Sequence, residues 1–467
     1  MTSRTRGLVK VCAMIVPAGM IALMPACGGG SLPSVELLSG IPAASESEAG
    51  TVDGVNPVEI TAWDEPPDDD ANKSGWQQET DDFAAKFPNI KVKHEKVDPT
   101  KYREQYLTAM AGGVGPDVWS GNAFPDIQKY IVNGFVADLT ERWNAYADKE
   151  QFSNAAIEAG TRNGRLYGFP RDIYVMTMVY NKELFKDAGI GAPPKTWDEF
   201  VRTAQRLTDP AIGQYGFNIL GTEWADWFFE YFVWQAGGDL TRRNDDGTAT
   251  LTFTSDAAVT ALQFYKDLKW KYKVVQKNAL QEWDRNLQDF AAGKAGMQIG
   301  SVDMFTGKGM NIGNIGLMPF PAGPSGKAYG QVGGALWTIN AHSPKDKQDA
   351  AWTYITYVSS KEQKEKELQW VKERGGFPNL FQVRKDIVVS AMFPDIRQDL
   401  VDAVLQTAAN PRQEYYLKDR LSKYVVAAIQ SILMDEKADP RTELQKQQRL
   451  AQKEVIDAFN EDIKSGK

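Results

Sequence analysis

Two segments near the start of the chain, 58–63 and 90–94, alternate between apolar and polar residues. This alternation predicts strands with one buried face. Apolar residues also recur at helical spacing in 75–86, at Tyr106, Leu107 and Met110 before Gly112, and at Ile127, Tyr130 and Ile131 before Gly134. Strands that alternate with helices of this length predict an α/β sheet with right-handed crossovers.

Two further helices are marked by their start signals. Thr196 and Glu199 form a capping box before an apolar stripe. Ser343-Pro344 predicts another helix, with the proline at its first position. The segment 415–463 shows helical patterns only. We therefore expect an α/β protein of two lobes with a helical C-terminal section.

Composition and charge exclude several classes of function. The 467 residues exceed what one core can hold, since cores stop growing at about 250–300 residues. A net charge of −8 argues against sequence-independent nucleic-acid binding, which needs a basic face. Two His and two Cys leave little for a zinc site, a His-based triad or a disulfide framework. We expect no metal and no cofactor, and the thirteen Trp must pack or grip a ligand.

The first 26 residues have the form of a secretory signal. Basic residues precede an apolar stretch, 11–24, of about 14 residues, which is shorter than the roughly 20 that span a membrane. The stretch ends at Ala26-Cys27, which resembles the bacterial lipoprotein signal. Met24 and Pro25 depart from the usual residues of that signal.

The lipoprotein resemblance implies that Cys27 is acylated and anchors the protein at the extracytoplasmic face of the cell membrane. Residues 28–56 are rich in Gly, Ser, Ala, Pro and Glu, so 27–57 are expected to form the lipidated residue and a flexible tether. A plain secretory signal or an uncleaved anchor is the alternative.

Segments spread over the rest of the chain carry a family resemblance. They include Gly112-Gly-Val-Gly-Pro-Asp-Val118, Gly164-Arg-Leu-Tyr-Gly-Phe-Pro170, Tyr180-Asn-Lys-Glu-Leu-Phe185, Phe290-Ala-Ala-Gly-Lys-Ala-Gly-Met297 and Gly333-Gly-Ala-Leu-Trp-Thr-Ile339. In this order they resemble the extracellular solute-binding proteins of ABC importers, specifically the carbohydrate-binding group that includes maltose-binding protein. The resemblance covers about residues 58–455.

The resemblance implies a two-lobed clamshell of the periplasmic-binding-protein type. The chain would cross between the lobes near Phe169, near Gly333 and near Arg374. Glycine suits such a crossing because it lets the backbone bend or approach a ligand closely. The expected divisions are lobe 1 at 58–168 plus 338–372, lobe 2 at 171–332 plus 377–455, and a C-terminal tail at 456–467.

A sugar offers apolar C–H faces and hydroxyl groups, so its cleft needs flat aromatic rings and paired polar atoms. Strand ends and post-strand loops supply both kinds of side chain, and the resemblance places these loops at the cleft. The ligand-binding candidates are Trp63, Asp64, Trp119, Asn122, Asp172, Tyr174, Trp224, Trp227, Asp303, Gly334 and Arg374.

Several candidates have an equally simple structural explanation. Trp224 and Trp227 share helical spacing with apolar residues that predict a buried helix face. Asp64 begins an acidic, solvated loop, and Arg374 suits an ordinary surface. Asp303 stands where relatives often carry Trp, so it suits hydroxyl recognition better than stacking.

The expected function is a membrane-anchored, monomeric binding protein that captures a sugar or oligosaccharide and delivers it to the transmembrane subunits of an ABC permease. We expect neither catalysis nor nucleic-acid binding. A secreted glycoside hydrolase is the alternative from another class, because it also needs aromatic rings and a pair of carboxyl groups. A binder of an anionic or peptide solute is the alternative within the binding class.

Overall fold

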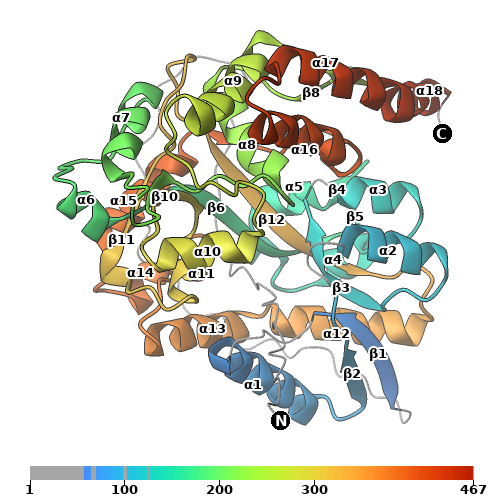
Figure 1. Cartoon of the computed structure of the whole chain (residues 1–467). Coiled ribbons are helices and arrows are strands. Elements are labelled where there is room, and N and C mark those ends of the chain that lie inside the picture. The colour runs from blue at the N-terminus through green and yellow to red at the C-terminus, as the bar shows by residue number, and fades with distance from the viewer. Residues whose placement is uncertain (1–56, 65–69, 98–101, 125, 466–467) are drawn as a thin grey trace, which may run out of the picture.

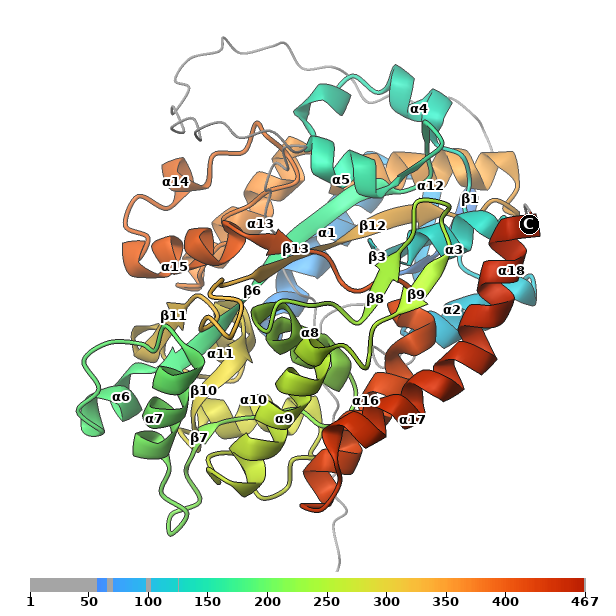
Figure 2. The ribbon, with the colours of Figure 1, turned by 90° about the horizontal axis from the view of Figure 1, so that it is seen from above.

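The computed structural model describes residues 57–64, 70–97, 102–124 and 126–465. These residues form a nine-stranded sheet surrounded by helices (Figures 1 and 2). The predicted signal, Cys27 and the predicted tether lie outside the described residues. The α/β class expected from the alternating patterns is confirmed.

The strands alternate in direction near the middle of the sheet and run parallel toward its ends. In spatial order they are β2 (Ile90–His94), β1 (Val58–Trp63), β3 (Val118–Ala123), β12 (Gly330–Ile339), β6 (Phe169–Asn181), β10 (Ala295–Gly300) and β7 (Tyr215–Phe217), with β11 (Ile315–Met318) on β6 and β13 (Pro411–Arg412) on β12. Strands β1, β2 and β3 are parallel, as are β7 and β10. Two hairpins, β4 (Thr161–Arg162) with β5 (Arg165–Leu166) and β8 (Thr241–Arg243) with β9 (Ala249–Leu251), lie apart from this sheet.

Strand β6 belongs to both halves of the sheet. Its first part, Phe169 to Met176, pairs with β12. Its second part, from Thr177 onward, pairs with β10 and β11. The side chains follow the same division, because Val175 packs in one hydrophobic core and Met176 in another. We call the core that contains Val175 the first core and the core that contains Met176 the second core. One continuous strand therefore joins two separate cores.

Helices cover both cores. In chain order they are α1 (Asp70–Lys86), α2 (Tyr102–Ala111), α3 (Ile127–Val132), α4 (Thr140–Ala145), η1 (Lys149–Gln151), α5 (Asn154–Ala159), α6 (Lys182–Asp187), α7 (Trp197–Leu207), α8 (Ala225–Gln235), α9 (Asp256–Trp270), α10 (Trp283–Ala291), α11 (Val302–Thr306), η2 (Ile312–Asn314), α12 (Lys345–Val358), α13 (Lys361–Glu373), α14 (Val389–Met392), α15 (Gln398–Ala408), α16 (Lys418–Met434), α17 (Pro440–Ala451), η3 (Gln452–Ile456) and α18 (Asp457–Ser465). The apolar faces of α8, α9 and α16 pack in the second core, whereas α12 packs in the first.

The helix-start predictions hold with two corrections. Thr196 caps α7 as predicted, since its hydroxyl accepts a hydrogen bond from the Glu199 N–H at 3.3 Å. Helix α1 begins at Asp70, earlier than predicted, and Gly75 lies inside it. A Cβ at Gly75 would lie 2.7 Å from the Trp370 ring, so glycine serves packing there. Pro344 is the N-cap of α12 rather than its first helical residue, because its backbone is extended (ψ 153°).

Candidate functional site

Four of the candidate residues lie at or beyond the ends of parallel strands, two in each half of the sheet. Trp63 ends β1 and Asn122 lies near the end of β3, whereas Trp224 follows β7 and Asp303 follows β10. Ligands of open α/β sheets bind outside such strand ends. The side chain of Asn122 lies outside the described part of the chain, so its prediction stays open.

Trp119 lies inside the first half of the molecule rather than at a surface. Its side chain is 3% exposed, and its ring centroid is 3.8 Å from that of Tyr106. Trp63 is only half-buried and meets Trp119 edge to face, with centroids 6.2 Å apart. We therefore assign Trp119 to packing, whereas Trp63 keeps an accessible part.

Both carboxylate oxygens of Asp64 contact other side chains of the protein. One carboxylate oxygen lies 2.6 Å from His94 Nδ1, and the other accepts a hydrogen bond from the Tyr354 hydroxyl. Its side chain is 7% exposed. These contacts hold the end of β1 against α12, so Asp64 has a structural task, and its expected ligand contact stays a prediction.

Asp172, Tyr174 and Gly334 lie together on the two crossing strands. The Asp172 carboxylate accepts a hydrogen bond from the Ala335 N–H at 3.0 Å and so ties β6 to β12. A Cβ at Gly334 would lie 2.3 Å from the Phe124 ring. The close approach predicted for Gly334 is therefore an approach to an aromatic side chain of the protein. Asp172 is buried, and Tyr174 is half-buried.

An aromatic run connects Tyr174 to Trp224 through consecutive ring contacts. Its members, in order, are Tyr174, Trp227, Phe228, Trp283 and Trp224, with successive ring centroids 6.3, 5.0, 5.1 and 6.4 Å apart. Tyr174, Trp227 and Trp224 are half-buried, whereas Phe228 and Trp283 are buried. The aromatic run thus begins on a crossing strand, ends beyond β7 and is uncovered in part at both ends.

The polar edge of Trp227 is held inside the protein. Its Nε1–H donates to the Gln331 side-chain oxygen, which also accepts a hydrogen bond from the Tyr231 hydroxyl at 2.7 Å. The Lys418 ammonium lies 5.4 Å from the centroid of the Trp227 ring. Trp227 therefore offers a ligand only the part of its ring that these neighbours leave open.

Trp224 and Asp303 lie at the starts of two helices that follow the paired strands β7 and β10. Trp224 is the N-cap of α8 and has a left-handed backbone, with φ 61°. Asp303 lies in the first turn of α11. Burial raises the pKa of Asp303, although Ser301 and backbone N–H groups act in the opposite direction.

Arg374 lies apart from these residues at the end of α13. It is exposed, and its guanidinium group stacks 3.6 Å from the centroid of the Trp370 ring. Trp370 packs in turn against Gly75 of α1. The structure therefore groups Arg374 with the α1–α13 contact and not with the aromatic run.

Sequence reasoning missed a buried cluster of charges beside Trp227. Lys418 Nζ lies 3.1 Å from a Glu414 oxygen and 3.8 Å from a Glu230 oxygen, and Glu230 is 0% exposed. Burial raises the pKa of Glu230 well above its usual range. Burial alone would raise the pKa of Glu414 too, but Lys418 and Arg103 hold it below its ordinary value. No local pattern marks this cluster, because Glu230 lies on α8, far from Glu414 and Lys418 in the sequence.

A second missed group lies where α1 meets α13. Burial raises the pKa of Glu79 to about 7, while Lys364 opposes the shift and Glu367 and Asp64 add to it. Lys364 and Glu367 form an ion pair at 2.8 Å. Nothing in the apolar pattern of α1 marks Glu79, because its environment comes from a helix in a distant part of the sequence.

Asp117 is a carboxylate with a structural role next to β1 and α12. It accepts hydrogen bonds from the Thr61 N–H at 2.9 Å and from the Ser343 hydroxyl at 2.6 Å. Among the residues that the structure describes, no group of His, Cys, Asp and Glu side chains is arranged to hold a metal ion. Over the same residues, no helix has the length and apolar character needed to cross a membrane.

Comparisons with known proteins agree with the geometry. A family model described as bacterial extracellular solute-binding protein matches residues 68–365. The diacetylchitobiose binding protein DasA of Streptomyces coelicolor is 27% identical over 297 residues, which cover 62% of this chain and 63% of the relative. The maltotriose-binding protein of Pyrococcus abyssi is 24% identical over 389 residues, which cover 80% of this chain and 78% of that one.

Solved structures extend the likeness to the fold. The GacH receptor of Streptomyces glaucescens is 21% identical and gives a TM-score of 0.72, over 87% of this chain and 100% of the receptor. This likeness confirms the expected two-lobed α/β fold. Because the family model covers more than half of the chain, this protein belongs to the bacterial extracellular solute-binding protein family.

Proposed function

We propose that this protein is the substrate-binding component of an ABC importer and that its ligand is a sugar or an oligosaccharide. The aromatic run carries the proposal, because it offers partly uncovered rings at Tyr174 and Trp224 with Trp227 between them. Aromatic faces suit the C–H faces of sugars. Asp303 supplies a carboxyl group that suits hydroxyl recognition.

The relatives support a carbohydrate ligand. Their names describe proteins that bind diacetylchitobiose and maltotriose, and the GacH receptor was solved in complex with acarbose. The expected ligand for this chain is therefore a carbohydrate of one or more rings. A secreted glycoside hydrolase is the weaker alternative, since the family consists of binding proteins.

The proposed mechanism is a shift of population between open and closed lobes. The expected lobe boundaries, 58–168 plus 338–372 and 171–332 plus 377–455, stay a prediction. The change of hydrophobic core between Val175 and Met176 supports two bodies joined by β6. Closure would bring Trp63 toward the aromatic run and present both lobes to a permease.

We further propose that Cys27 is the lipid-anchored first residue of the mature protein. The family is described as extracellular, which fits a chain that is exported and then retained at the membrane. Expression of the Cys27→Ala variant tests the anchor. The parent should fractionate with membranes and the variant with the soluble extracytoplasmic fraction; an unchanged distribution would remove the anchor.

A thermal-shift screen of mono- and oligosaccharides, with amino acids, short peptides and organic anions in parallel, tests the ligand class. A ligand that binds only the folded state raises the melting temperature. Shifts confined to sugars, confirmed by calorimetric titration, are the expected result. Shifts confined to peptides or anions would overturn the sugar proposal, and turnover of labelled oligosaccharides would establish the enzyme alternative.

A further inference from the structure

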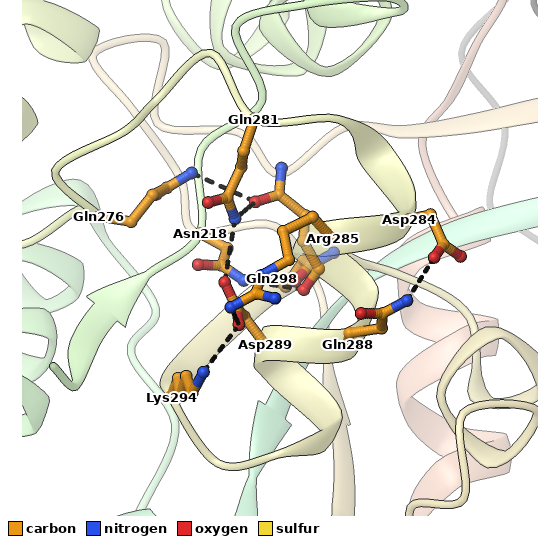
Figure 3. A network of polar contacts seen from close by, with 10 residues as sticks. Asn218, Gln276, Gln281, Asp284, Arg285, Gln288, Asp289, Lys294 and Gln298 are labelled. Atoms are coloured by element: carbon orange, nitrogen blue, oxygen red, sulfur yellow. Dashed lines mark hydrogen bonds and ion pairs between the residues drawn. The ribbon is translucent and has the colours of Figure 1, made fainter. Parts of the chain in front are cut away.

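The loop that carries Trp224 is held by an interlocked set of side-chain amides. It runs from Asn218, just beyond β7, to Trp224 at the start of α8. The amides come from Asn218 itself, from Gln276 and Gln281 before α10, from Asn286 on α10 and from Gln298 on β10 (Figure 3). We call these five residues the amide network. Four of them are buried and Gln281 is partly buried.

Gln276 bonds to both the backbone N–H and the backbone carbonyl of Ile219, near the start of the loop. Its side-chain oxygen accepts a hydrogen bond from the Ile219 N–H at 3.1 Å, and its Nε2 donates to the Ile219 carbonyl at 2.5 Å. The Asn286 Nδ2 donates to the same carbonyl at 3.3 Å. The side chain of Gln276 therefore acts like a strand neighbour for Ile219, two residues beyond the end of β7.

The remaining residues of the loop are fixed in turn. The Gly221 carbonyl accepts a hydrogen bond from Gln430 at 3.0 Å, and the Thr222 hydroxyl donates to the Gln281 carbonyl at 3.1 Å. The Glu223 carboxylate accepts a hydrogen bond from the Trp283 N–H at 2.9 Å. Trp224 then adopts the left-handed backbone that non-glycine residues reach only at a cost. The surrounding bonds maintain this conformation.

The amide network also reaches the strand that leads to Asp303. The Asn218 Nδ2 donates to the Gln298 side-chain oxygen at 2.9 Å. Gln298 lies on β10, which ends at Gly300, directly before the turn that contains Asp303. The amide network therefore links the loop of Trp224 with the segment of Asp303, and both are proposed ligand residues.

We infer that Gln276 is a positioning residue, which fixes the Trp224 ring in advance of ligand binding through its double contact with Ile219. This inference rests on the proposed function, because Trp224 must contact the ligand for its position to matter. A ring fixed before binding loses less conformational freedom on binding, and this favours affinity. Neutral amides suit the task because they bond to one another and to the backbone of the loop without burying a charge.

The test compares two buried glutamines. Gln276→Leu removes both contacts with Ile219, whereas Gln363→Leu removes a bond at 2.9 Å to the hydroxyl of Tyr357, which packs in the first core. We expect Gln276→Leu to weaken sugar binding several-fold and Gln363→Leu to leave it unchanged. A double variant, Gln276→Leu with Trp224→Ala, should bind as Trp224→Ala does, since Gln276 acts through that ring.

A spectroscopic measurement decides the point without a ligand. In protein labelled with 5-fluorotryptophan, the Trp224 resonance is the line that Trp224→Phe removes. We expect one narrow line in the parent and in Gln363→Leu, and a broadened or divided line in Gln276→Leu. If the Leu variant fails to fold, Gln276→Glu replaces it, because it retains only the acceptor for the Ile219 N–H.

The outcomes separate the two proposals. Independent, additive losses from Gln276→Leu and Trp224→Ala, or an unchanged Trp224 resonance, would overturn the positioning role. Absence of any sugar binding by the parent would overturn the proposed function instead, while the fluorine spectra would still report whether Gln276 fixes the loop.

Discussion

At the scale of single residues, exposure and hydrogen bonding separate ligand candidates from structural side chains. Asp64 contacts His94 and Tyr354 through its carboxylate, and the Trp119 ring packs against Tyr106. Trp224 and Tyr174 keep part of their surface uncovered. Contacts already made inside the protein limit what a ligand can add, and these contacts come from distant parts of the chain. Residue type and position along a strand therefore predict candidates but cannot rank them.

Trp224→Ala should weaken sugar binding by about 1–3 kcal/mol, because the variant loses the stacking surface of the indole. Calorimetric titration with the best ligand from the screen measures the change. Trp352→Ala is the matched control, since Trp352 is also half-buried but packs in the first core. Equal affinities for Trp224→Ala and the parent would remove Trp224 from the site.

Asp64→Asn should lower the free energy of unfolding by about 1–3 kcal/mol while leaving sugar affinity unchanged. The amide loses the charge that holds His94 and disturbs the bond from Tyr354. Urea denaturation gives the stability and titration the affinity. A stable variant with weakened binding would restore Asp64 as a ligand contact.

At the scale of elements, local patterns predicted the strands 58–63 and 90–94 with their observed bounds. Alternation and helix caps depend only on residues that are close in sequence, so the sequence alone is sufficient to predict these elements. The surroundings of Glu79 and Gly75 could not be predicted, because α13 supplies them from a distant part of the chain. The amide network could not be predicted from the sequence for the same reason, since contacts between distant elements leave no periodic signal.

Gly333→Ala should destabilise the protein by roughly 1–3 kcal/mol and weaken sugar binding. A Cβ at Gly333 would lie 2.5 Å from the Tyr174 ring, so the ring or the strand must move. Gly191→Ala is the matched control, because a Cβ at Gly191 would have no other atom within 4 Å among the described residues. Thermal melts and titrations check both effects, and a Gly333→Ala variant that matches Gly191→Ala would refute the close packing.

The contact between α1 and α13 should respond to pH. Burial raises the pKa of Glu79 from 4.5 to about 7, with Lys364 and Arg171 opposing the shift and Glu367 and Asp64 adding to it. Between these values the folded chain binds a proton that the unfolded chain has released. The contribution of Glu79 to stability is therefore complete below about pH 4.5 and declines as the pH rises toward 7.

Glu79→Gln should remove this component of the pH dependence. Melting temperatures of parent and variant, measured from pH 4.5 to 8, should diverge in slope between about pH 5 and 7. Glu365→Gln on α13 serves as the control, since the Glu365 side chain is 46% exposed and pairs with Lys361 at the surface. Parallel curves for the parent and Glu79→Gln would contradict the assignment.

At the scale of the whole molecule, an ion pair joins α3 to α16. Lys129 on α3 and Asp419 at the start of α16 lie 2.7 Å apart, with side chains 13% and 10% exposed. The apolar residues of α3 and α16 belong to different hydrophobic clusters. The pair therefore stabilises the contact between α3 and α16, and on the proposed mechanism separation of the lobes would break it.

If the proposed lobes open as the mechanism requires, Lys129→Met should shift the sugar-free protein toward open lobes and weaken sugar binding, because Asp419 loses its partner on α3. Small-angle scattering should give a larger radius of gyration for the variant. Reversal of the pair, Lys129→Asp with Asp419→Lys, should restore part of the closure. Lys91→Met, which removes an exposed pair with Glu59, provides the control. An unchanged radius would show that the pair does not bias the lobes.

The order in which the chain builds its first core affects folding during synthesis. Ile60 and Ala62 of β1 pack in the same cluster as Trp337 and Ile339 of β12 and Tyr354 of α12. Strand β3 also pairs with β12, which is synthesised much later, as its antiparallel neighbour. Strands β1, β2 and β3 can pair with one another early, but β12 and the later residues of their core are absent until most of the chain has been made. Such long-range closure slows folding. A nascent chain with this topology stays unfolded for longer, which is the state in which a polypeptide can be threaded through a secretion channel.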